Sequence, residues 1–152
     1  MPGERVPPRL RSAVIAQAAE CCEYCRSQAR FSPDPLSVEH IIPRSRGGRT
    51  ILSNLALSCQ GCNNHKYTFI EAQDPLTGEP APLYHPRRDA WSTHFVWAED
   101  YRVIVGLTPT GRATVVTLRL NRPSLMNLRR VLYAAGEHPP AMPSIGGGGM
   151  DA

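Results

Sequence analysis

Four of the five cysteines of this chain form two pairs, and the members of each pair are separated by two residues. The pairs are Cys22 with Cys25 and Cys59 with Cys62. Two residues between thiols let both sulfurs face one tetrahedral ion, so the spacing predicts a structural zinc site with four thiolate ligands. The alternatives are reduced free thiols or a redox pair. A redox site needs only one pair, and the second pair therefore favours zinc.

The fifth cysteine, Cys21, lies directly before Cys22. An odd number of cysteines without a signal peptide disfavours a disulfide scaffold. We assign Cys22 to the zinc site because it pairs with Cys25 at the spacing of Cys59 and Cys62. Cys21 is then expected to be a buried thiol at the end of a helix.

The segment between the two cysteine pairs carries side chains suited to cleaving a phosphodiester bond. That reaction needs a deprotonated water, stabilisation of charge on the phosphate and help for the leaving oxygen. A neutral imidazole such as that of His40 can accept a proton from water, and the carboxylate of Glu39 is a hard ligand for a divalent ion. Neighbouring side chains of an ideal strand point to opposite faces, so the strand must end or distort to bring these two toward one site. Pro43 and the following Gly47–Gly48 loop would permit that.

The order of these motifs resembles the HNH endonuclease family, a branch of the ββα-metal (His-Me finger) nucleases. The matching residues are the two cysteine pairs, Glu39 and His40 before Ile-Ile-Pro, Gly47 and Gly48, Asn54 and Leu55, and Asn63 and Lys66 after the second pair. The resemblance covers roughly residues 22–66. Asp is commoner in the family where this chain has Glu39, and many members have His in place of Asn63.

The resemblance implies a role for each polar residue of the motif. His40 would be the general base, and Asn54 would hold the loop and orient His40. Glu39 and Asn63 would hold one catalytic ion, Mg²⁺ or Mn²⁺, with His65 as the alternative ligand to Asn63. Outside this motif, His40 would be a structural or surface histidine and Glu39 a solvated carboxylate. Asn63 would cap a helix, and Asn54 would be a turn residue.

Basic side chains flank the motif and predict contacts with DNA phosphates. They are Arg44, Arg46, Arg49 and Lys66. Arginine matches phosphate geometry and gains affinity by counterion release. The alternatives are a solvated loop for the three arginines and a surface position for Lys66. The net charge of +4 suits a polyanionic partner, although many basic proteins bind no nucleic acid.

The hydrophobic pattern predicts the elements that position these residues. Residues 9–21 have apolar positions at helical spacing, residues 36–42 fit a strand, and a helix is expected to leave the second cysteine pair. Residues 52–59 fit either a short strand or a turn of helix. Together with the resemblance, this gives an α+β fold class. We expect a ββα-metal core with a four-cysteine zinc knuckle, an N-terminal helix, and a C-terminal β-hairpin plus helix.

The C-terminal half is predicted to pack on this core. Residues 91–97 and 101–107 alternate as half-buried strands do, and a turn signal predicts a hairpin between 101–107 and 112–120. Residues 122–136 fit an amphipathic helix. Trp91, Phe95 and Trp97 are expected to fill the core. A second candidate surface for nucleic acid comprises His85, Arg87, Arg88, His94 and Arg112.

The sequence thus predicts a nuclease core at 9–75, an extension at 76–137 and a disordered, Pro- and Gly-rich tail at 138–152. No apolar run approaches the roughly 20 residues that span a bilayer, and no signal segment is evident, so a cytoplasmic location is expected. The expected activity is metal-dependent hydrolysis of DNA. The alternatives are an inactive zinc-stapled nucleic-acid-binding module and a zinc-stapled interaction domain. Substrate preference and oligomeric state stay open.

Overall fold

The computed structural model describes residues 6–98 and 100–142, and it has a mixed α+β fold of short elements. In these residues, six strands form three antiparallel two-stranded sheets, β1 with β2, β3 with β4 and β5 with β6. The helices are α1 (Pro8–Gln17), α2 (Gln60–Lys66), α3 (Trp91–His94), α4 (Pro109–Leu118) and α5 (Pro123–Ala134). The strands are β1 (Ser37–His40), β2 (Leu55–Ser58), β3 (Glu71–Gln73), β4 (Pro80–Pro82), β5 (Phe95–Trp97) and β6 (Ile104–Gly106). The α+β class expected from the sequence is confirmed.

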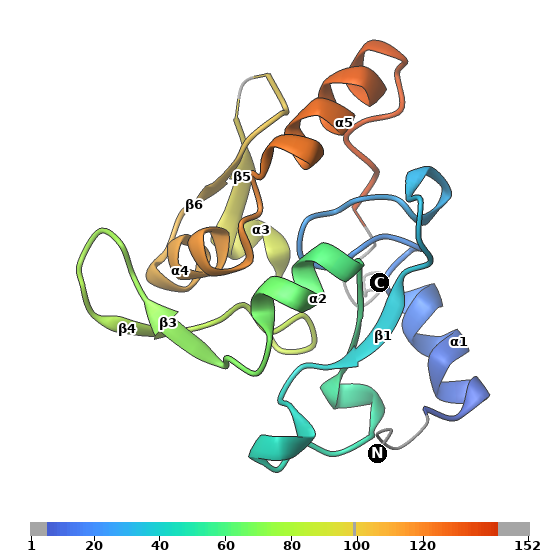
Figure 1. Ribbon diagram of the computed structural model, residues 1–152, viewed down its shortest axis with the longest axis vertical. Helices are drawn as coiled ribbons and strands as arrows, with labels where there is room; N and C mark the ends of the chain where they lie inside the picture. Colours follow the sequence, from blue (N-terminus) through green and yellow to red (C-terminus); the bar gives the residue numbers. More distant parts are fainter. Residues whose placement is uncertain (1–5, 99, 143–152) are drawn as a thin grey trace, which may run out of the picture.

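The centre of the fold is a β1–β2 pair followed at once by α2, as expected of a ββα core. The register runs from Ser37 opposite Ser58 to His40 opposite Leu55. Cys59 is the N-cap of α2, so the strand passes into the helix without a loop. In Figure 1, β1 lies between α1 and α2. The segment that fitted either a strand or a helical turn contains both, a short 3-10 helix at Leu52–Asn54 and then β2.

Both faces of the β1–β2 pair are covered, which explains why every residue of β2 is buried. Val38 and Leu57 pack with Val14 of α1 in one hydrophobic cluster. Ala56, on the opposite face of β2, belongs to a second cluster that includes the four paired cysteines and much of the extension. Side chains alternate between the two faces of a strand, so a strand that is buried on both faces has apolar residues at successive positions.

The prediction of a hairpin between residues 101–107 and 112–120 is wrong, because these two segments do not pair with each other. The strand β6 pairs instead with β5, and residues 109–118 form helix α4. The side chain of Thr108 accepts a hydrogen bond from Gly111 N at 2.9 Å, and Pro109 occupies the first turn. The Thr-Pro-Thr-Gly sequence therefore starts a helix rather than a turn, because Thr is a good N-cap and Pro is well suited to the first helical position.

Close packing of α4 on β6 outweighs the strand preference of the β-branched residues in α4. A Cβ atom at Gly111 would lie 2.1 Å from His94 O, and one at Gly106 would lie 2.5 Å from Arg112 N. The two glycines thus allow the backbones to approach more closely than any side chain would permit. The expectation for the aromatic core is confirmed for Trp91 and Phe95, which are buried with their ring centroids 5.1 Å apart, whereas Trp97 is only partly buried and packs against the same cluster.

Buried polar contacts join the extension to the core. Arg87 forms an ion pair with Glu23, and both side chains are more than nine-tenths buried. Arg87 Nε also donates to Leu55 O at 2.8 Å, while Glu23 accepts from Leu57 N at 2.9 Å. Trp91 Nε1 donates to Tyr24 O at 3.1 Å. The extension is therefore hydrogen-bonded directly to β2 and to the first cysteine pair.

The expected disordered tail begins at residue 138, and residues 143–152 of it lie outside the described residues. His138 itself is buried. Its ring lies edge-on to Trp97, and its Nε2 is 2.8 Å from Tyr101 O. The packed part of the chain thus extends at least to His138.

Asp74 is the buried charge that holds the turn between β3 and β4. Its carboxylate accepts from Arg112 Nε at 2.9 Å and Arg112 Nη2 at 2.8 Å, and also from Leu76 N and Thr77 Oγ1, each at 3.0 Å. These hydrogen bonds, those from Arg112 above all, hold the pKa of Asp74 below its usual range. Because the folded-state pKa is the lower one, the resulting stabilisation is complete above about pH 4 and is lost as the pH falls toward the folded-state pKa.

We expect Asp74→Asn to lower the melting temperature by several degrees at neutral pH, because it removes the charge that faces Arg112. The difference from the wild type should shrink as the pH falls below about 4. Circular dichroism melts across this pH range measure both effects, with the exposed Asp34→Asn as the matched control. An equal difference at every pH would contradict the assignment.

Candidate functional site

The four paired cysteines form one buried cluster. Their sulfur atoms all lie within 4.8 Å of one another. Cys25 Sγ and Cys59 Sγ are 3.7 Å apart, close to the roughly 3.8 Å that a tetrahedron of sulfurs about 2.3 Å from a zinc ion requires. The cluster contains Cys22 and not Cys21, as the sequence predicted. The geometry and the soft donors suit a zinc ion with no coordination position left for substrate.

The extension supplies positive charge to this cluster. Arg122, the residue before α5, places Nη2 3.4 Å from Cys59 Sγ and Nη1 3.7 Å from Cys62 Sγ. A Cβ atom at Gly61 would lie 2.4 Å from Arg122 Nη2, so the glycine leaves room for the guanidinium. Hydrogen bonds among the four thiols lower the pKa of Cys25 and of Cys59 and so favour their thiolates, whereas burial raises the pKa of Cys22 and hydrogen bonds raise that of Cys62.

A second arginine, Arg129, is buried behind the cluster and was also missed by the sequence reasoning. Its Nη2 donates to Leu120 O at 2.7 Å and lies 3.5 Å from Cys25 O. Four thiolates around a divalent zinc ion carry a net negative charge, which nearby guanidinium groups offset. Its burial could have been inferred from the sequence, because Arg129 follows Leu125 by four residues and so lies on the apolar face of the predicted C-terminal helix.

Glu39 and His40 occupy the last two positions of β1, where the strand leaves the sheet. His40 Nε2 lies 2.8 Å from Thr50 Oγ1, across the loop that joins β1 to β2. Glu39 is half-buried, and burial raises its pKa while Lys66 and Arg11 oppose that shift. The carboxylate is therefore close to the basic end of α2.

The loop after His40 is held by Asn54, which is buried. Asn54 Oδ1 accepts from Ile42 N at 2.8 Å, and its Nδ2 donates to Ile42 O at 3.0 Å and to Arg49 O at 2.9 Å. A Cβ atom at Gly48 would lie 1.7 Å from Ile42 O, so the loop closes tightly on itself. The Asn54 side chain thus joins the two ends of the loop, Ile42 at its start and Arg49 near its end.

We expect Asn54→Ala to destabilise the protein by about 2 to 4 kcal/mol, because three partly buried hydrogen bonds to the loop backbone are lost. Denaturant unfolding measures this change. Asn64→Ala, which removes an exposed asparagine side chain from α2, is the matched control and should change the stability little. Equal effects of the two substitutions would contradict the loop-holding role.

Asn63 and His65 lie on different sides of α2. Residues two apart in a helix differ by about 200°, and residues three apart by only about 60°. Asn63 therefore shares a side with Lys66, whose charge acts on Glu39. The charges that act on His65 are those of Arg122, Arg119 and Cys59. His65 thus lies on the side of α2 nearer to the four-cysteine cluster and the extension.

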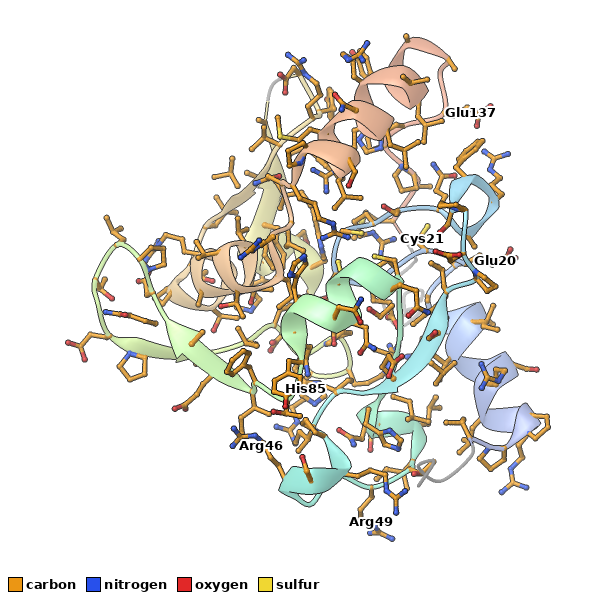
Figure 2. The ribbon with its side chains drawn as sticks, viewed as in Figure 1. Glu20, Cys21, Arg46, Arg49, His85 and Glu137 are labelled. Atoms are coloured by element: carbon orange, nitrogen blue, oxygen red, sulfur yellow. The ribbon has the colours of Figure 1, made fainter. Side chains whose placement is uncertain are left out.

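The basic residues of the motif differ in exposure. Arg44, Arg46 and Arg49 are exposed on the loop after β1, and Arg46 Nε donates to Thr68 O at 2.7 Å. Figure 2 shows Arg46, Arg49 and His85 toward the same end of the molecule in this view. Lys66 is 5% exposed, and its Nζ donates to Ile41 O at 2.7 Å. Burial lowers the pKa of Lys66 to about 8, opposed by Glu39.

The second candidate surface from the sequence separates into two groups. Arg87 is paired with Glu23, Arg112 is paired with Asp74, and His94 Nδ1 lies 2.6 Å from Thr108 Oγ1. These three side chains hold the fold together. His85 and Arg88 remain, and they line a pocket beside Lys66.

Residues 22–69 match the family model described as HNH endonuclease. The match begins at the first cysteine of the cluster, includes all four cluster cysteines and ends just after α2. The resemblance inferred from the sequence is thereby confirmed over this segment, and it is consistent with the ββα arrangement. It indicates a nuclease-type function with metal binding. No curated protein matches the chain. None of the helices in residues 6–98 and 100–142 is long and apolar enough to cross a membrane.

Proposed function

We propose that this protein is a metal-dependent endonuclease that hydrolyses DNA, with His40 as general base. The observation that carries the proposal is the end of β1, where Glu39 and His40 are the last two paired residues and lie beside the loop held by Asn54. This arrangement lies wholly within the segment that matches the HNH family model.

His40 is suited to accept a proton from water. If Nε2 carries the hydrogen and donates it to Thr50 Oγ1, the lone pair of the neutral imidazole lies on Nδ1. The neutral imidazole of His40 is then the group that takes the proton from the attacking water. Asn54 acts on this step only as a positioning residue, by fixing the loop that carries Thr50.

We propose that Glu39 and Asn63 hold one divalent ion, Mg²⁺ or Mn²⁺. A carboxylate and an amide oxygen are donors that such ions prefer. Bound there, the ion would stabilise charge on the scissile phosphate and assist the leaving oxygen. The exposed residues Arg44, Arg46 and Arg49 would contact the DNA backbone near this point. Cys22, Cys25, Cys59 and Cys62 would hold a zinc ion whose separate task would be to fix the scaffold.

The two candidate ligands on α2 can be separated by substitution. We expect Asn63→Ala to reduce nicking by about tenfold or more at limiting Mg²⁺, with partial recovery at high Mn²⁺, because one ligand is lost. His65→Ala should change the rate less than about twofold, since His65 faces Arg119 and Arg122. Metal titrations of the nicking rate measure both. The reverse order of effects would assign the ion to His65.

The test of the proposal is conversion of supercoiled plasmid by the zinc-loaded protein. We expect nicked and linear DNA with Mg²⁺ or Mn²⁺ and none without an added divalent ion. Salt-dependent DNA binding without cleavage in either metal would instead favour an inactive zinc-stapled binding module. Absence of binding at low salt would favour a zinc-stapled interaction domain.

A further inference from the structure

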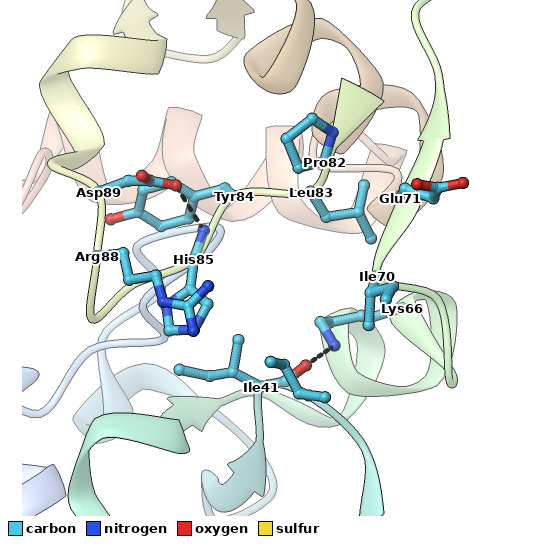
Figure 3. Close-up of a pocket in the computed structure, with 11 residues that line it drawn as sticks. Ile41, Lys66, Ile70, Glu71, Pro82, Leu83, Tyr84, His85, Arg88 and Asp89 are labelled. Carbon is cyan, nitrogen blue, oxygen red and sulfur yellow. Dashed lines mark hydrogen bonds between the residues drawn. The ribbon is translucent and has the colours of Figure 1, made fainter. Parts of the chain in front are cut away.

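A pocket of about 350 Å³ lies between the family-matched segment and the extension. Ile41, Lys66 and Ile70 line it from one side, and Leu83, His85 and Arg88 line it from the other. Figure 3 shows the two groups facing each other across the opening. The volume lies within the range of small-molecule sites.

The pocket adjoins the residues assigned to catalysis. Ile41 directly follows His40 in the chain, and its carbonyl oxygen accepts the hydrogen bond from Lys66 Nζ. The charge of Lys66 in turn acts on Glu39. A group bound here would therefore lie beside the end of β1.

The extension contributes hydrogen-bond donors to this pocket. Arg87 N donates to His85 Nδ1 at 3.2 Å, so the proton of the neutral ring is on Nε2. Burial and the neighbouring Arg88 both lower the pKa of His85, so the ring is neutral at physiological pH. The pocket thus has a neutral donor at His85 Nε2 and an exposed cation at Arg88 on the same side.

The acidic residues of the lining do not compete for these donors. Asp89 Oδ2 accepts from His85 N at 3.0 Å and lies 3.8 Å from His94 Nε2. Glu71 is exposed on β3, and in Figure 3 its carboxylate points away from His85. A ligand with an apolar face and an anionic group suits this lining best.

We propose that this pocket binds the nucleotide next to the scissile phosphate. Its base would pack on Ile41, Ile70 and Leu83, and its phosphate would accept hydrogen bonds from His85 Nε2 and Arg88. This inference rests on the proposed nuclease function and gives the extension a part in substrate binding. The positive charge matches the phosphate of a nucleotide, and the apolar walls match its base.

Binding of a fluorescein-labelled single-stranded oligonucleotide to the zinc-loaded protein tests the proposal. No Mg²⁺ or Mn²⁺ is added, so binding is measured without cleavage. We expect His85→Ala to weaken binding by about tenfold, as for loss of a hydrogen bond to a charged group. Glutamine places an amide N–H near the position of Nε2, whereas asparagine replaces only Nδ1. His85→Gln should therefore bind more tightly than His85→Asn.

The salt dependence separates the two donors. Arg88→Ala should reduce the slope of log affinity against log salt by about 0.7, one single-strand phosphate contact, and His85→Ala should leave it unchanged. Arg130→Ala, which removes an exposed cation from α5, is the matched control for charge. Ile70→Trp should weaken binding by filling the pocket, since Ile70 is on its open side with 37% of its surface exposed.

The outcomes distinguish this inference from the proposed function. If the wild type nicks plasmid and the His85 and Arg88 variants keep its oligonucleotide affinity and its KM, the pocket assignment is overturned. The proposed nuclease function then still holds. Loss of binding in those variants without any nicking in the wild type would overturn the nuclease and leave a nucleotide site. Competition by free dAMP at concentrations comparable to the oligonucleotide would show a mononucleotide site and overturn the flanking-nucleotide assignment.

Discussion

Replacing His40 by alanine is expected to lower the rate of plasmid nicking by about 10²- to 10⁴-fold, the usual contribution of a positioned general base. The side chain ends β1 and is half-buried, so its loss should leave the fold intact. Nicking time courses in Mg²⁺ and in Mn²⁺, with circular dichroism and zinc content measured in parallel, test both parts of this expectation.

The controls for this experiment follow from the contacts of the ring. Thr50→Val removes the hydroxyl next to His40 Nε2, so it should reduce the rate by about tenfold while the base remains. His65→Ala removes an imidazole that faces Arg119 and Arg122, and it should retain near wild-type activity. Undiminished nicking by His40→Ala would show that another group, or a contaminating nuclease, cleaves the DNA.

Removal of zinc is expected to unfold the protein. Structural zinc sites bind with apparent free energies of about 10 to 16 kcal/mol, which is comparable to or larger than the net stability of a domain of this kind, about 5 to 15 kcal/mol. The cluster lies within the larger hydrophobic core, and Arg122 would lose the negative charge that it faces. A strong chelator should therefore abolish the cooperative thermal transition, and added Zn²⁺ should restore it.

Two cysteine variants make this expectation specific to the cluster. Cys62→Ser should lose zinc and the folded state, because it removes one of four clustered sulfurs. Cys21→Ser replaces a buried thiol outside the cluster and should retain one zinc ion per chain, as measured by elemental analysis. A melting temperature that does not change after zinc is stripped would contradict the four-thiolate site.

The sequence predicted the four-cysteine cluster and the ββα core because short spacings along the chain signal both. Two residues between cysteines bring their sulfurs together, whatever the rest of the chain does. The strand ending at His40 is similarly local, since its apolar residues and the following Pro43 define it. Asn54 could be named from the resemblance alone, although its three hydrogen bonds to the loop became visible only in the structure.

Long-range contacts explain what the sequence did not predict. Residues 109–118 look like a strand by composition, but Thr108 and Pro109 start a helix there, and Gly106 and Gly111 let that helix pack closely against β6 and the end of α3. Arg87 looked like a surface cation and is instead the buried partner of Glu23, 64 residues away in the chain. Lys66 is similarly buried against Ile41 O, 25 residues away. No local pattern reports which distant residue a cation will meet.

The contact of Arg122 with Cys59 and Cys62 means that the family-matched segment depends on a residue outside it. The family-matched segment ends at residue 69, yet the guanidinium beside Cys59 and Cys62 comes from residue 122. A graft of the matched segment into another scaffold would carry the metal ligands without their counterion. In this protein, the four-cysteine cluster therefore keeps its neighbouring positive charge only when the segment that contains Arg122 is present as well.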